Sequence, residues 1–145
     1  MIYVLYGQPG SGKTSLGKLL ATHLDTPFII DGDEFREMFT NTNYDREGRE
    51  ENIRNANAVA TYLSKKSRYA GHVVMSLINP YEHLRRELKQ NNKDQVTEVL
   101  LQSERGLKRE YHVEDFGIGL PDCIMNTDQE TEISWNRLKD TLKIT

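Results

Sequence analysis

The stretch Gly7-Gln8-Pro9-Gly10-Ser11-Gly12-Lys13-Thr14 decides the fold of this chain. It fits the pattern G-x-x-x-x-G-K-[ST], in which glycines let a loop curl until successive backbone N–H groups point at phosphate oxygens. An apolar run at residues 2–6 precedes it, and a helical pattern begins at Lys13. The loop therefore lies between a strand and a helix, as phosphate binding requires. A plain glycine-rich turn is the alternative.

The polar groups of this loop have expected partners on a nucleoside triphosphate. Lys13 would neutralise the β and γ phosphates, and the hydroxyl of Thr14 would ligate Mg²⁺. GTPases and motor ATPases use the same loop, so triphosphate binding does not by itself identify a kinase. The residues expected to bind the nucleotide are Gly7, Gly10, Ser11, Gly12, Lys13, Thr14 and Ser15.

Strand-like and helix-like segments alternate along the chain. Apolar or β-branched runs predict strands at residues 2–6, 28–30, 72–78 and 96–101, with a weaker one at 122–125. Helical spacing lies near residues 13–24, 33–40, 46–70, 80–91 and 128–142. This alternation predicts an α/β P-loop NTPase fold, a parallel five-stranded sheet with helices on both faces. The charged segment 102–121 breaks the pattern and is predicted to be a mobile, lid-like flap.

Composition narrows the functional classes. A length of 145 residues suits one domain, residues 1–145. With 19 Lys and Arg against 22 Asp and Glu, the net charge of -3 argues against nucleic acid as a partner. No apolar run approaches membrane-spanning length, Met1 leads directly into the first expected strand without a signal peptide, and the single cysteine, Cys123, precludes an intramolecular disulfide. We therefore expect a cytoplasmic protein with a small-molecule substrate and no membrane partner. No role is assigned to the scattered histidines, His23, His72, His83 and His112.

Two carboxylates and an arginine follow the second expected strand, in Asp31-Gly32-Asp33-Glu34-Phe35-Arg36. The carboxyl ends of parallel strands are where open α/β sheets bind ligands. Asp31 would hold a water on Mg²⁺, and Asp33 would accept the proton of an attacking hydroxyl, so both join Lys13 as candidate catalytic residues. The alternative is a turn into an acidic helix, with Asp33 as its N-cap.

Several stretches together resemble the adenylylsulfate kinase family. Besides the P-loop and residues 31–36, the chain has Tyr44 before Arg49-Glu50-Glu51-Asn52-Ile53-Arg54, and later Ser76-Leu77-Ile78-Asn79-Pro80-Tyr81. Each of these stretches is similar to a motif of that family, in the same order. Members phosphorylate the 3′-hydroxyl of adenosine 5′-phosphosulfate (APS) with MgATP, so the resemblance implies ATP and Mg²⁺ as cofactors. It also implies a homodimer, since family members commonly form one.

The resemblance also implies an acceptor site. Arg36, Arg49 and Asn52 would grip the phosphosulfate and its nucleoside, and Tyr44 would stack on the acceptor adenine where the family carries Phe. Asp33 would bind the acceptor hydroxyl, and the cleft would include Ile78, Asn79 and Pro80. Each motif also has a simpler explanation: a solvated helix surface for residues 49–54 and a strand-to-helix turn for residues 78–81.

Similarity to the family weakens beyond about residue 100. Arg105, Lys108 and Arg109 would cover the triphosphate, in a lid shorter than the family's. Lys108 would also bind the acceptor, and Phe116 would pack on it. Glu34 and Glu82 stand where the family carries Asn and Arg. Two alternatives therefore remain open: a kinase of the same fold with another small hydroxylated or nucleotide acceptor, and a nucleotide-binding module with little catalysis.

Overall fold

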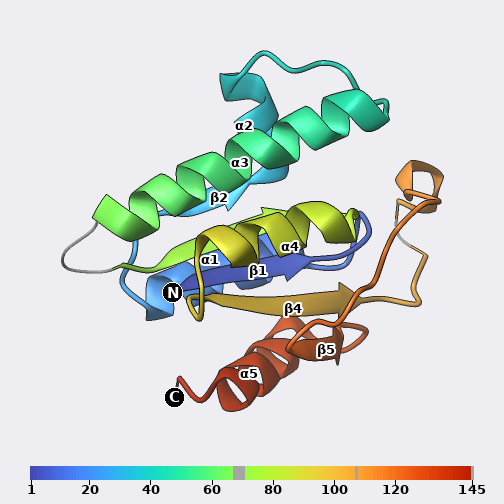
Figure 1. Cartoon of the computed structure of the whole chain (residues 1–145). Helices are drawn as coiled ribbons and strands as arrows, with labels where there is room; N and C mark the ends of the chain where they lie inside the picture. The colour runs from blue at the N-terminus through green and yellow to red at the C-terminus, as the bar shows by residue number, and fades with distance from the viewer. Residues whose placement is uncertain (67–70, 107, 145) are drawn as a thin grey trace.

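A parallel sheet forms the centre of the fold (Figure 1). The computed structural model describes residues 1–66, 71–106 and 108–144, and within these ranges five strands pair in the order β2-β3-β1-β4-β5. Every neighbouring pair is parallel. The strands are β1 (Ile2–Tyr6), β2 (Ile29–Asp31), β3 (Val73–Leu77), β4 (Val96–Gln102) and β5 (Cys123–Asn126). The predicted sheet is confirmed, and every strand end lies within one residue of its predicted position.

The helices follow the predicted alternation. They are α1 (Lys13–His23), α2 (Gly32–Met38), α3 (Arg46–Lys66), α4 (Glu82–Asn91) and α5 (Thr131–Leu142). The prediction that the third helix reaches residue 70 concerns positions 67–70, which lie outside the described residues. The fourth helix begins later than predicted because Tyr81 still has extended backbone, with φ -103° and ψ 110°. None of the helices in the described part of the chain is long and apolar enough to cross a membrane.

Helices cover both faces of the sheet, and β1 contributes to the core on each side. Ile2, Val4 and Tyr6 pack in the cluster with α3 and α4, whereas Tyr3 and Leu5 pack in the cluster with α1 and α5. Alternate side chains of a strand point to opposite faces, so a central strand covered on both sides is buried throughout. All of β1 is buried. The loop that follows β1 therefore emerges at the middle of the sheet's carboxyl edge.

The residue that caps the N-terminus of α2 is not the one named in the alternative interpretation. Asp31 is the N-cap of α2, because its Oδ1 accepts hydrogen bonds from the backbone N–H groups of Asp33 at 3.1 Å and Glu34 at 3.4 Å. The interpretation of Asp33 as the cap is therefore wrong. Asp33 lies in the first turn with its side chain exposed, which leaves its carboxylate available to a ligand.

The segment between β4 and β5, drawn in gold and orange in Figure 1, leaves the sheet edge and returns over it. It contains a 3₁₀ turn, η1 (Arg109–Tyr111), and Leu107 lies outside the described residues. Its returning half is bonded to the body. The Tyr6 hydroxyl donates to the Ile118 carbonyl at 2.7 Å, and buried Arg85 donates to the carbonyls of Gly117 at 2.5 Å and Ile118 at 3.1 Å. The returning half of the predicted flap thus docks on the carboxyl edge of the sheet, and the described residues of the segment between β4 and β5 are called the lid below.

Helix α1 lies so close to β3 that a side chain at Gly17 has no room. A Cβ built on Gly17 would lie 2.3 Å from Ser76 Oγ, whereas the next atoms, on Ser76 and Val74, are 3.6 Å away. We therefore expect Gly17→Ala to lower the free energy of unfolding by about 1–3 kcal/mol in urea denaturation, because the hydroxyl must move.

The clash involves one atom, and this allows a matched control. In a Ser76→Ala background the same substitution should be neutral or stabilising, since alanine has up to about 1 kcal/mol better helix propensity than glycine. Equal destabilisation in both backgrounds would show that the hydroxyl is not what excludes a side chain here.

Candidate functional site

The loop between β1 and α1 has the backbone shape that its glycines permit. Gly10 has φ 85° and Gly12 has φ 91°, in the left-handed region that other residues rarely adopt. These two residues turn the chain so that α1 begins at Lys13, directly above the carboxyl end of the central strand. The helix N-terminus with its unpaired N–H groups therefore faces the same space as the loop.

Contacts from distant parts of the chain hold this loop in place. The side chain of Gln8 forms a reciprocal pair with the backbone of Val113, donating to its carbonyl at 2.8 Å and accepting from its N–H at 2.9 Å. On the other flank, the Thr127 hydroxyl donates to the Ser11 carbonyl at 2.9 Å. The loop is thus fixed by the lid on one side and by the residue after β5 on the other.

Lys13 folds back on the loop that contains it. Its Nζ donates to the Gln8 carbonyl at 2.9 Å and to Ser11 Oγ at 3.3 Å. Burial lowers the pKa of Lys13 to about 8, and the nearby carboxylates of Asp31 and Asp33 oppose that change. A poorly solvated ammonium group with neutral hydrogen-bond partners is well placed to donate to a phosphate oxygen.

Thr14 and Asp31 place two oxygen atoms that could ligate a metal ion beside the P-loop. Thr14 Oγ1 donates to Asp31 Oδ2 at 2.8 Å, while Asp31 Oδ1 caps α2. A hydroxyl next to a carboxylate suits Mg²⁺, which prefers hard oxygen ligands and keeps several waters. Within the described residues, no group of three or more His, Cys, Asp or Glu side chains is placed to hold a metal ion. A magnesium ion here would therefore need phosphate and water oxygens to complete its shell.

A cavity of about 940 Å³ opens along the carboxyl edge of the sheet, with the P-loop in its wall. It brings together most of the residues predicted from the sequence. The predicted residues that line it are Gly10, Gly12, Lys13, Thr14, Ser15, Asp31, Asp33, Arg36, Tyr44, Arg49, Asn52, Ile78, Asn79, Pro80, Arg105 and Lys108.

Four predicted residues lie elsewhere. Gly7 is buried behind the loop, and Ser11 lines a second cavity of about 540 Å³ together with Arg109 and Phe116. The Phe116 ring stacks on Tyr6, with ring centroids 6.1 Å apart and an interplanar angle of 2°. The structure therefore does not bring Arg109 and Phe116 to the wall of the larger cavity, where the sequence analysis expected them.

Positive charge predominates in the larger cavity although the chain as a whole carries -3. Five basic residues line it, against the three carboxylates of Asp31, Asp33 and Glu110. Charges of one sign gathered in a concave wall raise the local concentration of ligands of the opposite sign. The cavity thus suits an anionic ligand. The basic residues are Lys13, Arg36, Arg49, Arg105 and Lys108.

The arginines on the β2 side of the cavity are already oriented. The guanidinium of Arg36 lies 4.3 Å from the centre of the Tyr44 ring, and its NH1 donates to the Asn43 carbonyl at 2.8 Å. NH1 of Arg49 donates to the Tyr81 hydroxyl at 3.4 Å. These contacts reduce the side-chain entropy that ligand binding would otherwise cost.

Two buried amides in the same wall have side-chain atoms without a hydrogen-bond partner in the described part of the chain. Asn52 is 5% exposed and Asn79 is 1% exposed. Within the described residues, Asn52 Oδ1 and both polar side-chain atoms of Asn79 have no hydrogen-bond partner. Leaving a buried polar group unpaired costs about 1–3 kcal/mol. Unpaired amides in the wall of a cavity are consistent with a site that a polar ligand completes.

Sequence analysis missed several residues that shape the site. His112, one of the four histidines to which no role was assigned, contacts the Pro9 carbonyl through Nε2 at 3.2 Å and lines the cavity. No role was predicted for Gln8, because any residue is allowed at its position in the loop pattern. Thr127 and Gln129 follow β5, and the rule that ligands bind at the carboxyl ends of strands would have pointed to them.

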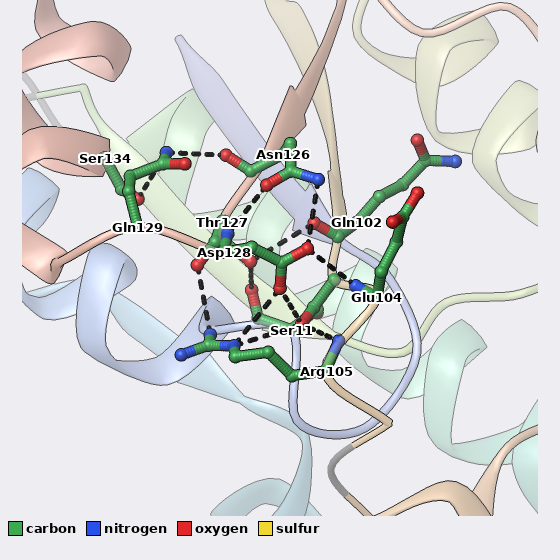
Figure 2. Close-up of polar contacts among 10 residues, drawn as sticks. Ser11, Gln102, Glu104, Arg105, Asn126, Thr127, Asp128, Gln129 and Ser134 are labelled. Atoms are coloured by element: carbon green, nitrogen blue, oxygen red, sulfur yellow. Dashed lines mark hydrogen bonds and ion pairs between the residues drawn. The ribbon is translucent and has the colours of Figure 1, made fainter.

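An acidic residue anchors the start of the lid (Figure 2). Asp128 accepts hydrogen bonds from Ser103 Oγ at 2.6 Å and from the Glu104 N–H at 2.8 Å, and its Oδ1 lies 3.2 Å from Arg105 Nε. The hydrogen bond from Ser103 and the others around it lower the pKa of Asp128 to about 2. NH2 of Arg105 donates to the Thr127 carbonyl at 3.0 Å. The guanidinium is therefore held at the cavity wall beside the P-loop.

Known proteins with similar sequences are kinases. The cytidylate kinase of Pyrobaculum arsenaticum is 27% identical over 120 residues, which cover 77% of this chain and 65% of that protein. The cytidine diphosphoramidate kinase of Campylobacter jejuni is 32% identical over 90 residues, covering 59% of this chain and 53% of that protein. The chain thus spans less than two thirds of the length of either relative.

Solved structures share the fold. An APS kinase of Mycobacterium tuberculosis, solved in complex with AMPPNP and APS, matches with a TM-score of 0.79 and 22% identity, covering 98% of this chain and 96% of that one. At this level of identity the likeness shows the fold alone. It agrees with the parallel sheet and the P-loop position described above.

The sequence profile of the adenylylsulphate kinase family matches residues 1–113. This match includes the P-loop, residues 31–36, and the two later stretches that suggested the resemblance, and it extends into the lid. It covers well over half of the chain, so the protein belongs to the adenylylsulphate kinase family.

Proposed function

We propose that this protein is an ATP-dependent kinase that transfers the γ-phosphoryl group to the 3′-hydroxyl of APS. The observation that carries the proposal is that the exposed carboxylate of Asp33 lines the same cavity as Lys13 and Thr14 of the P-loop. A hydroxyl bound beside Asp33 would face a terminal phosphate held by the loop, which is the proximity that phosphoryl transfer needs. Membership of the adenylylsulphate kinase family supports this assignment.

The P-loop would bind the donor. Its backbone N–H groups, the N-terminus of α1 and the Lys13 ammonium group would hold the β and γ phosphates and stabilise the charge that develops during transfer. Thr14 and Asp31 would hold Mg²⁺, which supplies charge neutralisation across the phosphate oxygens when bound. Lys108 would cover the triphosphate from the lid and exclude water, and Arg105 would lie beside the donor nucleoside.

Asp33 would act on the acceptor. The hydroxyl oxygen attacks the γ phosphorus and forms the new P–O bond, while the bond from that phosphorus to the β–γ bridging oxygen breaks. The hydroxyl proton passes to the Asp33 carboxylate, and ADP leaves with its new charge held by Lys13 and the loop amides. Asp31 is already committed to Thr14 and the α2 cap, so Asp33 is the better candidate for the base.

The acceptor would occupy the β2 side of the cavity. Arg36 and Arg49 present planar donors that suit the oxygens of a phosphosulfate. The exposed ring of Tyr44 offers a stacking surface for a base, and the unpaired amides of Asn52 and Asn79 would pair with its polar edges. Together these groups fit a nucleotide that carries an anionic 5′ substituent and a free hydroxyl.

A second acceptor class is favoured by a specific observation. The relative that is 32% identical is named a cytidine diphosphoramidate kinase, and Glu34 and Glu82 replace residues that are usual in APS kinases. The second candidate is therefore the same transfer to a cytidine nucleotide whose 5′ phosphates carry a small anionic or amide substituent.

A panel of acceptors tests both candidates. The purified protein with MgATP should release ADP fastest with APS, compared with cytidine diphosphoramidate, CMP and no acceptor, in a coupled assay. Faster release with cytidine diphosphoramidate would replace the first candidate with the second. Saturable ATP binding without stimulation by any acceptor would contradict both and leave a nucleotide-binding module.

Substituting the proposed base tests the mechanism. Asp33→Asn should lower kcat by roughly 10²- to 10⁴-fold, because general base catalysis contributes about that much, while the Kd for ATP stays nearly unchanged. Glu37→Gln is the matched control, since this carboxylate on the same helix, α2, is exposed and does not line the cavity. Equal kcat values for the two variants would refute the assignment.

The lowered pKa of Lys13 predicts proton uptake on nucleotide binding. With a pKa of about 8, Lys13 is only partly protonated at pH 8, and bound phosphates would raise that pKa again. About half a proton should therefore be taken up per MgADP at pH 8. Titration calorimetry in buffers of different ionisation enthalpy measures this uptake.

Two lysine variants separate this effect from other titrating groups. Lys13→Met should abolish the dependence of the binding heat on the buffer, whereas Lys18→Met, at an exposed position of α1, should preserve it. Heats that are identical in all buffers for the unmodified protein would contradict the prediction.

A further inference from the structure

The order of the strands divides the cavity into two ends. The P-loop follows the central strand β1, Asp33 follows β2 at one edge of the sheet, and Thr127 follows β5 at the other. If the acceptor lies beside Asp33, as proposed above, the donor nucleoside must extend from the P-loop toward the β5 edge. The cavity wall at that end includes Arg105, Thr127 and Gln129.

Gln129 has a fixed amide orientation at this end of the cavity. Its Nε2 donates to the backbone carbonyl of Asn126 at 2.7 Å and to Ser134 Oγ at 2.9 Å, as Figure 2 shows. A carbonyl oxygen can only accept, so the nitrogen of the amide must lie on that side. Both Nε2 hydrogens are thereby used.

The other end of the amide is an acceptor without a partner. Among the residues that the structure describes, no donor is bonded to Gln129 Oε1, although a carboxamide oxygen has two lone pairs to offer. Gln129 is partly buried and lines the cavity. The anchored nitrogen prevents the amide from flipping to present a donor there instead.

A second group at this end is equally fixed. Asp128 and the Thr127 carbonyl hold the Arg105 guanidinium, which also lines the cavity. A planar cation offers a face on which any nucleobase can stack, without preference among bases. Stacking on Arg105 would therefore supply affinity, and discrimination among bases must come from a polar atom at the edge of the base.

We propose that Gln129 determines the specificity for the donor base, with Oε1 accepting a hydrogen bond from an exocyclic amino group. Adenine presents such a group, so ATP fits. A base with a carbonyl in that place, such as the hypoxanthine of inosine nucleotides, would place its carbonyl oxygen next to Oε1, and two acceptors form no hydrogen bond. A site whose fixed acceptor pairs with the amino group of one base disfavours a base that lacks that donor, because the hydrogen bond is lost and two acceptors cannot pair. This proposal rests on the proposed function in one respect, the end of the cavity at which the donor nucleotide binds.

Three nucleotides that differ at one group test the proposal. ATP carries the amino group, the triphosphate of purine riboside carries hydrogen there, and inosine triphosphate carries oxygen. In the unmodified protein, kcat/KM should be about threefold to tenfold lower for the purine analogue than for ATP, because one hydrogen bond is lost. It should be lower still for inosine triphosphate, because the carbonyl oxygen of that base lies against the Oε1 acceptor.

The nearly isosteric variant Gln129→Met should bring these ratios close to one by lowering kcat/KM for ATP, with kcat at saturating ATP retained. Gln90→Met, at an exposed position of α4 away from the cavity, is the matched control and should keep the original ratios. A uniform loss for all three nucleotides in Gln129→Met would mean that Gln129 only supports the loop, and would overturn the proposal.

Binding measurements keep this test separate from the proposed function. Titration with MgADP and with the magnesium complex of inosine diphosphate needs no acceptor and no turnover. Preference for ADP that disappears in Gln129→Met supports the proposal even if no acceptor is phosphorylated. Equal affinity for the two diphosphates in the unmodified protein overturns it even if the kinase assay succeeds.

Discussion

The amides of the P-loop must point inward before any phosphate arrives, and the rest of the site depends on this constraint. Neighbouring elements hold the loop from three directions. The Gly7 N–H donates to the Ile78 carbonyl after β3 at 3.3 Å, Thr127 after β5 donates to Ser11, and Gln8 pairs with the lid. Groups that need no rearrangement during transfer are the ones that stabilise developing charge most effectively.

The same supports determine which side chains surround the loop. Because the contacts come from the segments after β3 and β5 and from the lid, those segments bring Asn79, Gln129 and Arg105 into one cavity wall. The carboxylates of Asp31 and Asp33 enter from β2 and α2 on the opposite flank. The P-loop at the centre of the cavity and the two ends at which the proposed substrates would bind thus share one set of hydrogen bonds.

Local patterns predicted much of this arrangement. The P-loop, the positions of the strands along the chain and the carboxylates after β2 are each visible within a few consecutive residues. The strand ends lie within one residue of their predicted positions. The failures concern non-local contacts. Phe116 stacks on Tyr6 outside the larger cavity, and His112 contacts the Pro9 carbonyl in the P-loop. No short pattern encodes a contact between segments about a hundred residues apart.

The sequence by itself determined the alternation of strands and helices and the phosphate-binding loop, because backbone propensity, glycine conformations and hydrophobic periodicity act over a few residues. Only the tertiary structure decided that Gln129 is anchored through Nε2, how the Arg105 guanidinium is held, and that burial lowers the pKa of Lys13. These properties depend on distances between chain segments and on the exclusion of water. Both arise only when the sheet assembles and its carboxyl edge is covered by the lid.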